Sequence, residues 1–215
     1  MYKKKPFFIV FEGIEGCGKS FQSKKLYKYL KKRKIESILT REPGGTKSSE
    51  LIRSLILKDY FTKNTKEKFD KYTDTLLYLA ARNEHIKNKI KPALLKKKIV
   101  ICDRFTDSTI AYQVHGKKVD INFINNIHDK ILYGIKPNIV FVLKVSEKSS
   151  IRRLKKRRTK NRYDNFKQSF YRKAQKSFIN LAKNKKNYFI LDSSSNDKSL
   201  ENTISKIVNR FLKIR

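Results

Sequence analysis

The stretch GIEGCGKS, residues 13–20, restricts the possible folds more than any other part of the chain. It matches the pattern G-x-x-x-x-G-K-[ST] and is separated by one residue, Glu12, from the apolar run FFIVF. Glycines let the backbone curve tightly with several N–H groups pointing inward, and a helix that begins at the loop adds positive potential. The pattern is typical of a loop that cradles the phosphates of a nucleoside triphosphate. It predicts a strand before the loop and a helix after it.

We expect the whole loop to bind a nucleoside triphosphate, which the family resemblance described below identifies as ATP. Lys19 can reach the β- and γ-phosphates, and the Ser20 hydroxyl can ligate Mg²⁺. Cys17 stands between two glycines where a small side chain is needed, which favours a space-filling role over a redox role. Glu15 is unusual, because a carboxylate beside a triphosphate is unfavourable unless it faces a sugar hydroxyl or a cation. The predicted ATP-binding residues are Gly13, Ile14, Glu15, Gly16, Cys17, Gly18, Lys19 and Ser20.

The rest of the chain alternates between strand-like and helix-like patterns. Apolar, β-branched and aromatic runs predict buried strands at 7–11, 99–102, 139–145 and 188–191, with a weaker one at 37–40. Helical periodicity follows the glycine loop and returns at 73–89, 169–183 and 200–212. This alternation predicts an α/β fold of the P-loop NTPase type, with a five-stranded parallel sheet covered by helices on both faces. We expect a single domain over residues 1–215.

The residues that follow the predicted strands are candidates for binding an acceptor phosphate, because ligands of parallel sheets bind at the carboxyl ends of the strands. Arg41 lies in TREPGGT after the second strand and is suited to clamp a phosphate. Asp103 and Arg104 follow the third strand. Asp103 could hold Mg²⁺ through water while Arg104 reaches the phosphate. An Asp-Arg pair at a strand end can also be a simple ion pair.

Two helical segments supply candidates for binding a base. Tyr78 and Arg82 in LLYLAAR are four residues apart and share one helix face, where a ring and a guanidinium can stack on and hydrogen-bond a base. A tyrosine at this spacing can equally belong to the core. After Arg104, one face of a predicted helix carries Ser108, Thr109, Tyr112 and Gln113.

The formal net charge of +34 would ordinarily suggest a nucleic-acid-binding protein. Lysine outnumbers arginine, isoleucine and asparagine are abundant and alanine is scarce, as expected when an AT-rich genome determines codon usage. We therefore attribute the charge to compositional drift and expect no dedicated nucleic-acid partner. Small polyanionic substrates would still be attracted.

Cysteine and histidine usage indicates neither disulfides nor a metal centre. The two cysteines, Cys17 and Cys102, provide no disulfide framework, and His85, His115 and His128 are scattered. The apolar run near the start is short and ends at Glu12, unlike a secretory signal or a membrane span. These features predict a cytoplasmic protein with no membrane partner.

One basic segment, RRLKKRRTKNRYDN at 152–165, stands out for its charge and its lack of apolar residues. It is either the solvated end of a helix or a mobile lid that grips phosphates. We place the candidate lid at approximately 152–166.

Taken together, the motifs resemble those of the thymidylate kinase family over nearly the whole chain. FEGIEGCGKS looks like the family P-loop, TREPGGT and IRSLIL like its second motif, and YLAAR like its base-binding helix. DRFTDSTIAYQ looks like its Asp-Arg motif, and RYDNF with FYRKAQKSFINLA like its lid and the following helix. The resemblance implies transfer of the ATP γ-phosphoryl group to dTMP, giving dTDP and ADP for dTTP synthesis and DNA replication.

The resemblance also implies roles for individual residues in binding dTMP. Arg41 and Arg104 would hold the dTMP phosphate, and Glu15 would face the 3′-hydroxyl of the deoxyribose. Tyr78 would stack on thymine while Arg82 hydrogen-bonds its O4 atom. The rest of the pocket would be completed by Ser108, Thr109, Tyr112 and Gln113, with Tyr112 crowding out a 2′-hydroxyl.

In this family an additional catalytic arginine stands either in the P-loop or in the lid. The P-loop position is Gly16 here, so the candidates are the lid residues Arg157, Arg158 and Arg162. Together with Lys19 and Arg104 they would neutralise charge during in-line transfer. No strong general base is expected, because an acceptor phosphate is already ionised at neutral pH. Family members are commonly homodimers, so a homodimer is expected.

Four residues depart from the family pattern. Tyr78 replaces the usual phenylalanine, and Phe21 stands where a small hydroxyl residue is common. Asn161 replaces a typical aspartate and Gln175 a usual arginine, which puts the charge pairing of the lid in doubt.

Two alternative functions are compatible with the P-loop. Another nucleotide or deoxynucleoside kinase would share the scaffold, and a nucleic-acid-binding P-loop ATPase would account for the charge. The second alternative lacks a recognisable RNA or DNA motif in the sequence.

Overall fold

The structure is a computed structural model that describes residues 5–57, 68–156, 168–195 and 197–214. The described strands are β1 (Phe7–Glu12), β2 (Ser37–Arg41), β3 (Ile99–Asp103), β4 (Ile139–Lys144) and β5 (Tyr188–Asp192). The described helices are α1 (Lys19–Lys32), α2 (Lys47–Leu57), α3 (Lys71–His85), η1 (Ile86–Ile90), α4 (Lys91–Leu95), α5 (Thr106–Thr109), η2 (Ile110–Val114), α6 (His115–Lys117), α7 (Ile121–Ile131), α8 (Glu147–Lys155), α9 (Gln168–Ala182) and α10 (Lys198–Leu212).

The strands form one parallel sheet in the order β2-β3-β1-β4-β5, with β1 at its centre. Phe11 of β1 lies opposite Asp103 of β3 on one side and Phe141 of β4 on the other. Asp103 in turn lies opposite Arg41 of β2. The carboxyl ends of the three strands that carry the sequence motifs therefore meet at one edge of the sheet. The predicted parallel sheet is confirmed.

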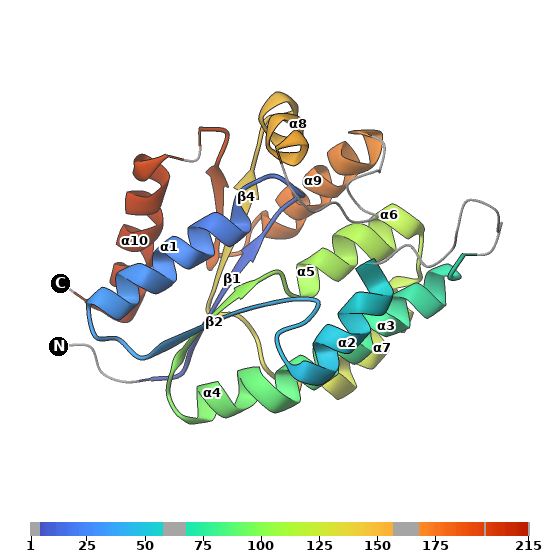
Figure 1. Cartoon of the computed structure of the whole chain (residues 1–215), viewed down its shortest axis with the longest axis horizontal. Coiled ribbons are helices and arrows are strands. Elements are labelled where there is room, and N and C mark those ends of the chain that lie inside the picture. Colours follow the sequence, from blue (N-terminus) through green and yellow to red (C-terminus); the bar gives the residue numbers. More distant parts are fainter. Residues whose placement is uncertain (1–4, 58–67, 157–167, 196, 215) are drawn as a thin grey trace.

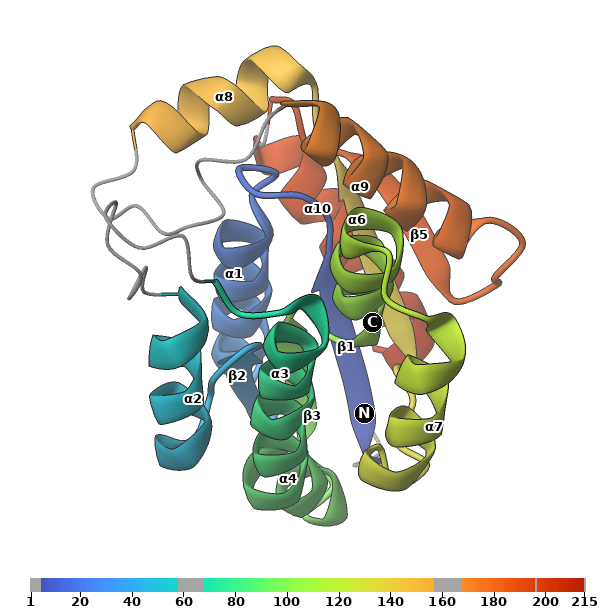
Figure 2. The ribbon, with the colours of Figure 1, turned by 90° about the vertical axis from the view of Figure 1, so that its right-hand side faces the viewer.

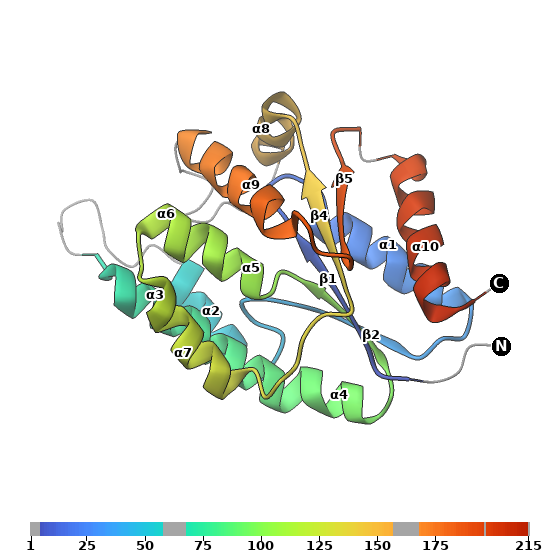
Figure 3. The ribbon, with the colours of Figure 1, turned by 180° about the vertical axis from the view of Figure 1, so that it is seen from behind.

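Helices cover both faces of the sheet, as expected (Figures 1 and 3). One face carries α1 and α10, and the other carries α3, α4, α7, α9 and the segment from α5 to α6. Helix α2 packs beside α3. Figure 2 shows α8 at the end of the molecule where the chain turns from β1 into α1. That end is where the glycine-rich loop at residues 13–18 lies.

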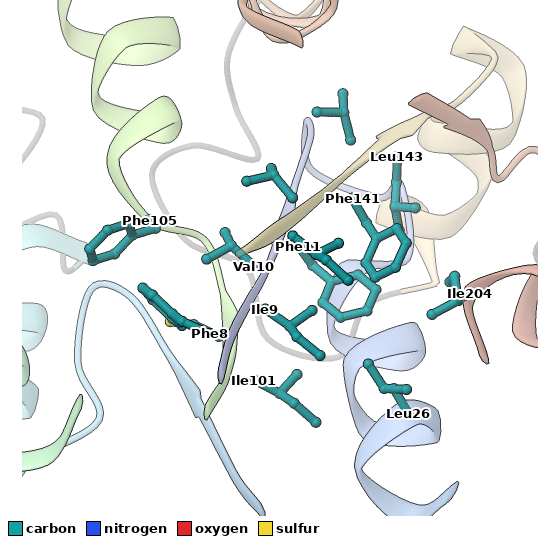
Figure 4. Packing of buried hydrophobic residues seen from close by; sticks show 14 of the residues in the cluster. Phe8, Ile9, Val10, Phe11, Leu26, Ile101, Phe105, Phe141, Leu143 and Ile204 are labelled. Atoms are coloured by element: carbon teal, nitrogen blue, oxygen red, sulfur yellow. The ribbon is translucent and has the colours of Figure 1, made fainter. Parts of the chain in front are cut away.

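The core is built around β1, whose residues are all buried. Alternate side chains of β1 point to opposite faces (Figure 4). Phe8 packs edge-on against Phe105, with ring centroids 5.0 Å apart. On the opposite side, Phe11 lies toward Leu26 of α1 and Ile204 of α10. The central strand thus holds both helical layers and fixes the position of the loop that follows it.

Helices α2, α7 and α8 are among those not expected from apolar periodicity, and α7 and α8 begin with a local signal. The Asp120 carboxylate accepts a hydrogen bond from the backbone N–H of Asn122 at the start of α7. The Ser146 hydroxyl accepts one from the Ser149 N–H at the start of α8. Such caps satisfy backbone N–H groups that have no partner within the helix. Short helices of this kind depend on caps and packing more than on a long apolar stripe.

In the part of the chain that the structure describes, no helix has the length and apolar character needed to cross a membrane. The same residues contain no group of three or more His, Cys, Asp or Glu side chains placed to hold a metal ion.

Candidate functional site

A cavity of about 1000 Å³ opens at the carboxyl ends of β1, β2 and β3. This volume is at the upper end of the usual range of roughly 300–1,000 Å³ for the site of one small ligand. The structure brings most of the predicted site residues together in its lining: Glu15, Gly16, Gly18, Lys19, Ser20, Arg41, Tyr78, Arg82, Asp103, Arg104, Ser108, Thr109, Tyr112 and Gln113.

The remaining loop residues, Gly13, Ile14 and Cys17, are buried rather than part of this lining. They contribute contacts to Lys19. The Lys19 ammonium donates to the carbonyl oxygens of Gly13 at 3.0 Å and Ile14 at 2.8 Å, and it lies 3.5 Å from the Cys17 sulfur. Cys17 therefore fills space beneath the loop.

Ser20 and Asp103 are joined directly, because the Ser20 hydroxyl donates to the Asp103 carboxylate. Ser20 lies in the first turn of α1, and Asp103 is the last residue of β3. A hydroxyl and a carboxylate that meet in the wall of this cavity are oxygen ligands of the kind that Mg²⁺ prefers.

Arg104 is held by three contacts in a left-handed backbone conformation, with φ of 75°. Its guanidinium donates to the Gly13 carbonyl at 2.9 Å, to the Ser108 hydroxyl at 3.1 Å and to Glu15 at 2.7 Å. Burial alone would lower the pKa of Arg104, but the facing Glu15 carboxylate raises it well above its ordinary value. Non-glycine residues in this conformation concentrate at functional sites.

Glu15 bridges the loop and the helix that follows Arg104. One of its carboxylate oxygens pairs with Arg104, and the other accepts a hydrogen bond from the Tyr112 hydroxyl at 2.5 Å. Burial works against ionisation, yet Arg104 and Lys19 hold the pKa of Glu15 below its usual value. Burial and the Glu15 charge raise the pKa of Tyr112. The carboxylate that was unusual in the sequence thus faces cations and a hydroxyl.

Arg41, the last residue of β2, also lines the cavity, and its side chain is about half exposed. Its guanidinium contacts both carboxylate oxygens of Glu50 at 3.1 Å, and Glu50 also accepts from the Gly45 N–H at 2.8 Å. Arg53 of α2 lines the same cavity. Sequence reasoning missed Arg53 as a site residue, although it lies in the quoted motif IRSLIL.

Arg82 is buried and is held from four directions. Its Nε atom donates to Glu42 at 2.7 Å, and one terminal nitrogen contacts the Thr109 hydroxyl at 2.7 Å and His128 Nε2 at 2.9 Å. The other terminal nitrogen donates to the Phe105 carbonyl at 2.9 Å. Glu42 and His128 were not predicted from the sequence.

Glu42 is also held by His85, the second buried histidine. His85 Nδ1 lies 3.1 Å from Glu42, and its Nε2 lies 2.6 Å from the Thr40 hydroxyl. Burial disfavours the charged carboxylate, but Arg82 and His85 keep the pKa of Glu42 below its usual value. A sequence signal was present, because Glu42 lies inside TREPGGT and His85 follows Arg82 by one helical turn.

Two base-binding candidates, Tyr78 and Gln113, also line the cavity, and Tyr78 is partly buried. The Gln113 side chain is 2% exposed, and its amide Nε2 has no hydrogen-bond partner among the described residues. A buried donor in this situation is costly unless a ligand or water satisfies it.

A buried carboxyl, Glu12, supports the turn that carries Arg104. It accepts hydrogen bonds from the Phe105 N–H at 2.7 Å and the Ser108 hydroxyl at 2.6 Å. Burial, reinforced by the nearby Asp107 carboxylate, raises the pKa of Glu12 to about 8. Glu12 immediately precedes the loop but was not predicted as a site residue.

Helix α8 packs directly on the P-loop. The Ser150 hydroxyl donates to the Glu15 carbonyl at 2.9 Å, and Arg153 donates to the Gly16 carbonyl at 3.1 Å. Arg153 also donates to the carbonyls of Ser193 at 2.9 Å and Ser194 at 2.6 Å, which follow β5. A Cβ atom at Gly16, where φ is 72°, would lie 2.8 Å from the Ser150 carbonyl oxygen. The packing of α8 therefore requires glycine at this position.

Much of the candidate lid at 152–166 lies outside the described residues, including Asn161 and the candidates Arg157, Arg158 and Arg162. Its described start, residues 152–155, is the last part of α8. Gln175 of α9 bonds to the N–H and carbonyl of Val145 at 3.0 and 3.1 Å. Phe21 is 44% exposed at the rim of the cavity.

Comparisons with known proteins agree on one family. The sequence model described as thymidylate kinase matches residues 11–204. A thymidylate kinase of Aster yellows witches'-broom phytoplasma is 39% identical over 96% of this chain and 99% of that protein. A thymidylate kinase of a Wolbachia from Brugia malayi is 43% identical over 82% of each chain. The crystal structure of thymidylate kinase from Ehrlichia chaffeensis superposes with a TM-score of 0.74 at 31% identity, covering 95% of this chain and 99% of that one.

Proposed function

The chain belongs to the thymidylate kinase family, and from this premise we infer that it transfers the γ-phosphoryl group of ATP to dTMP. The observation that carries the assignment is the single cavity that joins the P-loop to Arg41, Arg104 and Tyr78. A phosphate-donor loop beside two arginines suits an acceptor that already carries a phosphate. An acceptor without a phosphate would leave these arginines unused.

The acceptor phosphate is proposed to bind between Arg41 and Arg104. Arg104 is fixed by Glu15 and by the Gly13 carbonyl, so little side-chain freedom is lost on binding. The two carboxylate oxygens of Glu15 accept from Arg104 and Tyr112, and their remaining acceptor capacity can bind the 3′-hydroxyl of the sugar.

On the donor side, the backbone N–H groups of the P-loop and Lys19 are proposed to hold the triphosphate. Lys19 donates to two loop carbonyls here, so phosphate oxygens would replace neutral acceptors with charged ones. The lid arginines, Arg157, Arg158 and Arg162, are proposed to neutralise charge as transfer proceeds. No general base is required, because the acceptor phosphate oxygen is already ionised.

Ser20, with Asp103 acting through water, would hold Mg²⁺. Their hydrogen-bonded oxygens fit an ion that keeps several waters and binds substrate phosphates. When bound, the ion would neutralise charge on the β- and γ-phosphates.

Thymine is proposed to stack on Tyr78 and to meet the amides and hydroxyls of the helix after Arg104. The unsatisfied Gln113 amide gives that helix a donor for a base carbonyl. Tyr112, fixed by Glu15, would crowd a 2′-hydroxyl and favour deoxyribose.

We also propose a homodimer formed through α2 and α3. These adjacent helices expose Leu51 at 71%, Leu76 at 47% and Leu55 at 42%. Exposed leucines on two helices that pack side by side favour a protein interface. Light scattering should give twice the chain mass, and Leu51→Lys with Leu76→Lys should give a monomer. A monomeric wild type at micromolar concentration would reject the dimer. The cytoplasmic location stays a prediction.

The function is tested by an ADP-release assay with ATP, Mg²⁺ and a panel of acceptors: dTMP, dUMP, dCMP, dGMP and thymidine. We expect dTMP to give the highest kcat/KM and DNA to have no effect. Preference for thymidine would contradict the phosphate-binding roles of Arg41 and Arg104. Hydrolysis that requires DNA or RNA, with no monophosphate turnover, would support the nucleic-acid-dependent ATPase instead.

A further inference from the structure

Arg82 reaches the cavity with most of its hydrogen-bonding capacity already used. A guanidinium has five N–H groups and accepts no hydrogen bonds. Contacts with Glu42, Thr109, His128 and the Phe105 carbonyl engage four of them. Among the contacts of the described residues, one Nη2–H remains for a ligand in the cavity that Arg82 lines.

His128 can accept a hydrogen bond from Arg82 in only one protonation state. Because the guanidinium can only donate, His128 Nε2 must accept, and the imidazole is neutral with its proton on Nδ1. Burial, with the Arg82 charge, lowers the pKa of His128 to about 3. The accepting form therefore persists throughout the neutral range.

The position of His128 is set by packing between two helices. His128 lies on α7, whereas Arg82 lies on α3. Leu79 of α3 and Ile124 of α7 share a separate apolar cluster with Val119. This cluster holds the two helices together, so the imidazole meets the guanidinium at a fixed place.

We infer that His128 is a positioning residue for base recognition: it fixes the Arg82 guanidinium so that its remaining N–H meets a hydrogen-bond acceptor on the base. The inference rests on the proposed function and deepens it. Thymine presents a carbonyl acceptor at position 4, whereas cytosine presents an amino donor there. A guanidinium held in one orientation discriminates between the two bases. Opposite cytosine, the N–H of Arg82 would face an amino group, and neither donor would have an acceptor.

The test compares His128→Leu with His128→Gln. Leucine keeps the apolar bulk but removes the acceptor, so the guanidinium loses one restraint. Glutamine places an amide oxygen where it can accept from Arg82 and should restore the contact. A matched control is His115→Gln, because His115 bonds to Ser177 at 2.5 Å, outside the Arg82 cluster.

For His128→Leu we expect the KM for dTMP to rise about tenfold and the preference for dTMP over dCMP in kcat/KM to fall about tenfold, as for one lost hydrogen bond to a charged group. The KM for ATP should stay within twofold. His128→Gln and His115→Gln should stay within threefold of the wild type on every parameter.

Unchanged dTMP kinetics in His128→Leu would overturn the inference. So would equal losses for dTMP and ATP in both variants, which would indicate a purely structural role. If His128→Leu does not fold, nitrogen-15 spectra of the wild-type histidines decide the question, because a proton on Nε2 of His128 at pH 7 excludes the acceptor role. Turnover of dTMP by the wild type tests the proposed function separately. If the proposed function is wrong, the wild type shows it before any variant is compared.

Discussion

Arg82 Nε lies 2.7 Å from Glu42 Oε2, and the two side chains are 3% and 4% exposed. Removing one partner of such a pair leaves an uncompensated charge in the interior, which costs about 3–5 kcal/mol. We therefore expect Glu42→Leu to lower the free energy of unfolding by about that amount, measured by urea denaturation.

The matched control for Glu42→Leu is Glu147→Leu, which changes the net charge equally. Glu147 pairs with Arg172 at 2.8 Å, but the side chains are 44% and 69% exposed. Exposed pairs contribute about 0–1 kcal/mol, so this variant should unfold nearly as the wild type does. Equal stability of the two variants would show that the buried pair contributes no more than an exposed one.

The raised pKa of Glu12 predicts a stability that falls as the pH rises. Between its ordinary value near 4.5 and about 8, the folded protein holds a proton on Glu12 that the unfolded chain releases. Unfolding should therefore become easier through this window, with a slope of up to about 1.4 kcal/mol per pH unit from this group. Asp107, whose pKa is also raised by burial, acts in the same direction over its own range.

The check is the difference in unfolding free energy between Glu12→Gln and the wild type from pH 5 to pH 8. Glutamine stays neutral at every pH. The unfolding free energy of the variant should therefore increase relative to that of the wild type as the pH rises. A flat difference would mean that Glu12 is ionised in the folded protein at neutral pH.

Lys19 and Tyr78 should affect different kinetic parameters. Lys19→Met removes a charge expected to act most strongly during transfer, so kcat should fall about 10²-fold or more. Tyr78→Ala removes a stacking surface for the base, and such stacking contributes about 1–3 kcal/mol, so the KM for dTMP should rise about tenfold or more. Steady-state kinetics with both substrates varied measures the split. The same pattern of changes in both variants would contradict the two roles.

Arg153 ties the P-loop to the segment after β5, and its loss should weaken ATP binding selectively. We expect Arg153→Ala to raise the KM for ATP about tenfold, because the Gly16 carbonyl and those of Ser193 and Ser194 lose their common donor. The KM for dTMP should change less than twofold. Lys148→Ala, at an exposed position on α8 outside the candidate lid, is the control and should leave both KM values unchanged. An equal rise for both substrates in Arg153→Ala would exclude a selective effect.

The strands and the P-loop were predictable from the sequence because their signals are local. A run such as FFIVF followed by GIEGCGKS specifies strand, loop and helix within a few residues, and the observed bounds of β1 differ by one residue from the prediction. The helix predicted at 73–89 begins at Lys71, because Asp70 caps it by accepting from the Tyr72 N–H. Caps shift helix ends without changing the apolar pattern.

The contacts around Arg82 were not predictable, although Glu42 lies inside the motif TREPGGT, because the contacting residues are distant in sequence. Glu42 lies 40 residues before Arg82, and His128 lies 46 residues after it. No periodicity or spacing relates these positions, and a lone histidine on a helix has many possible roles. Their meeting depends on how α3 and α7 pack beside the end of β2. The left-handed conformation of Arg104 likewise depends on contacts with Gly13 and Glu15 rather than on the residue type.

The division between strand interiors and strand ends also bears on how such a chain can evolve. Inside β1, β3 and β4, buried isoleucine and valine serve the same packing purpose, so mutational bias can exchange one for the other at modest cost. The residues proposed to bind and transfer phosphate, Lys19, Arg41 and Arg104, lie outside those segments. A genome under pressure toward particular codons can therefore rewrite the core and the lysine-rich surface while the reacting groups keep their places. A single-residue deletion within β3 is a different event, since it would turn Asp103 to the opposite face of the sheet.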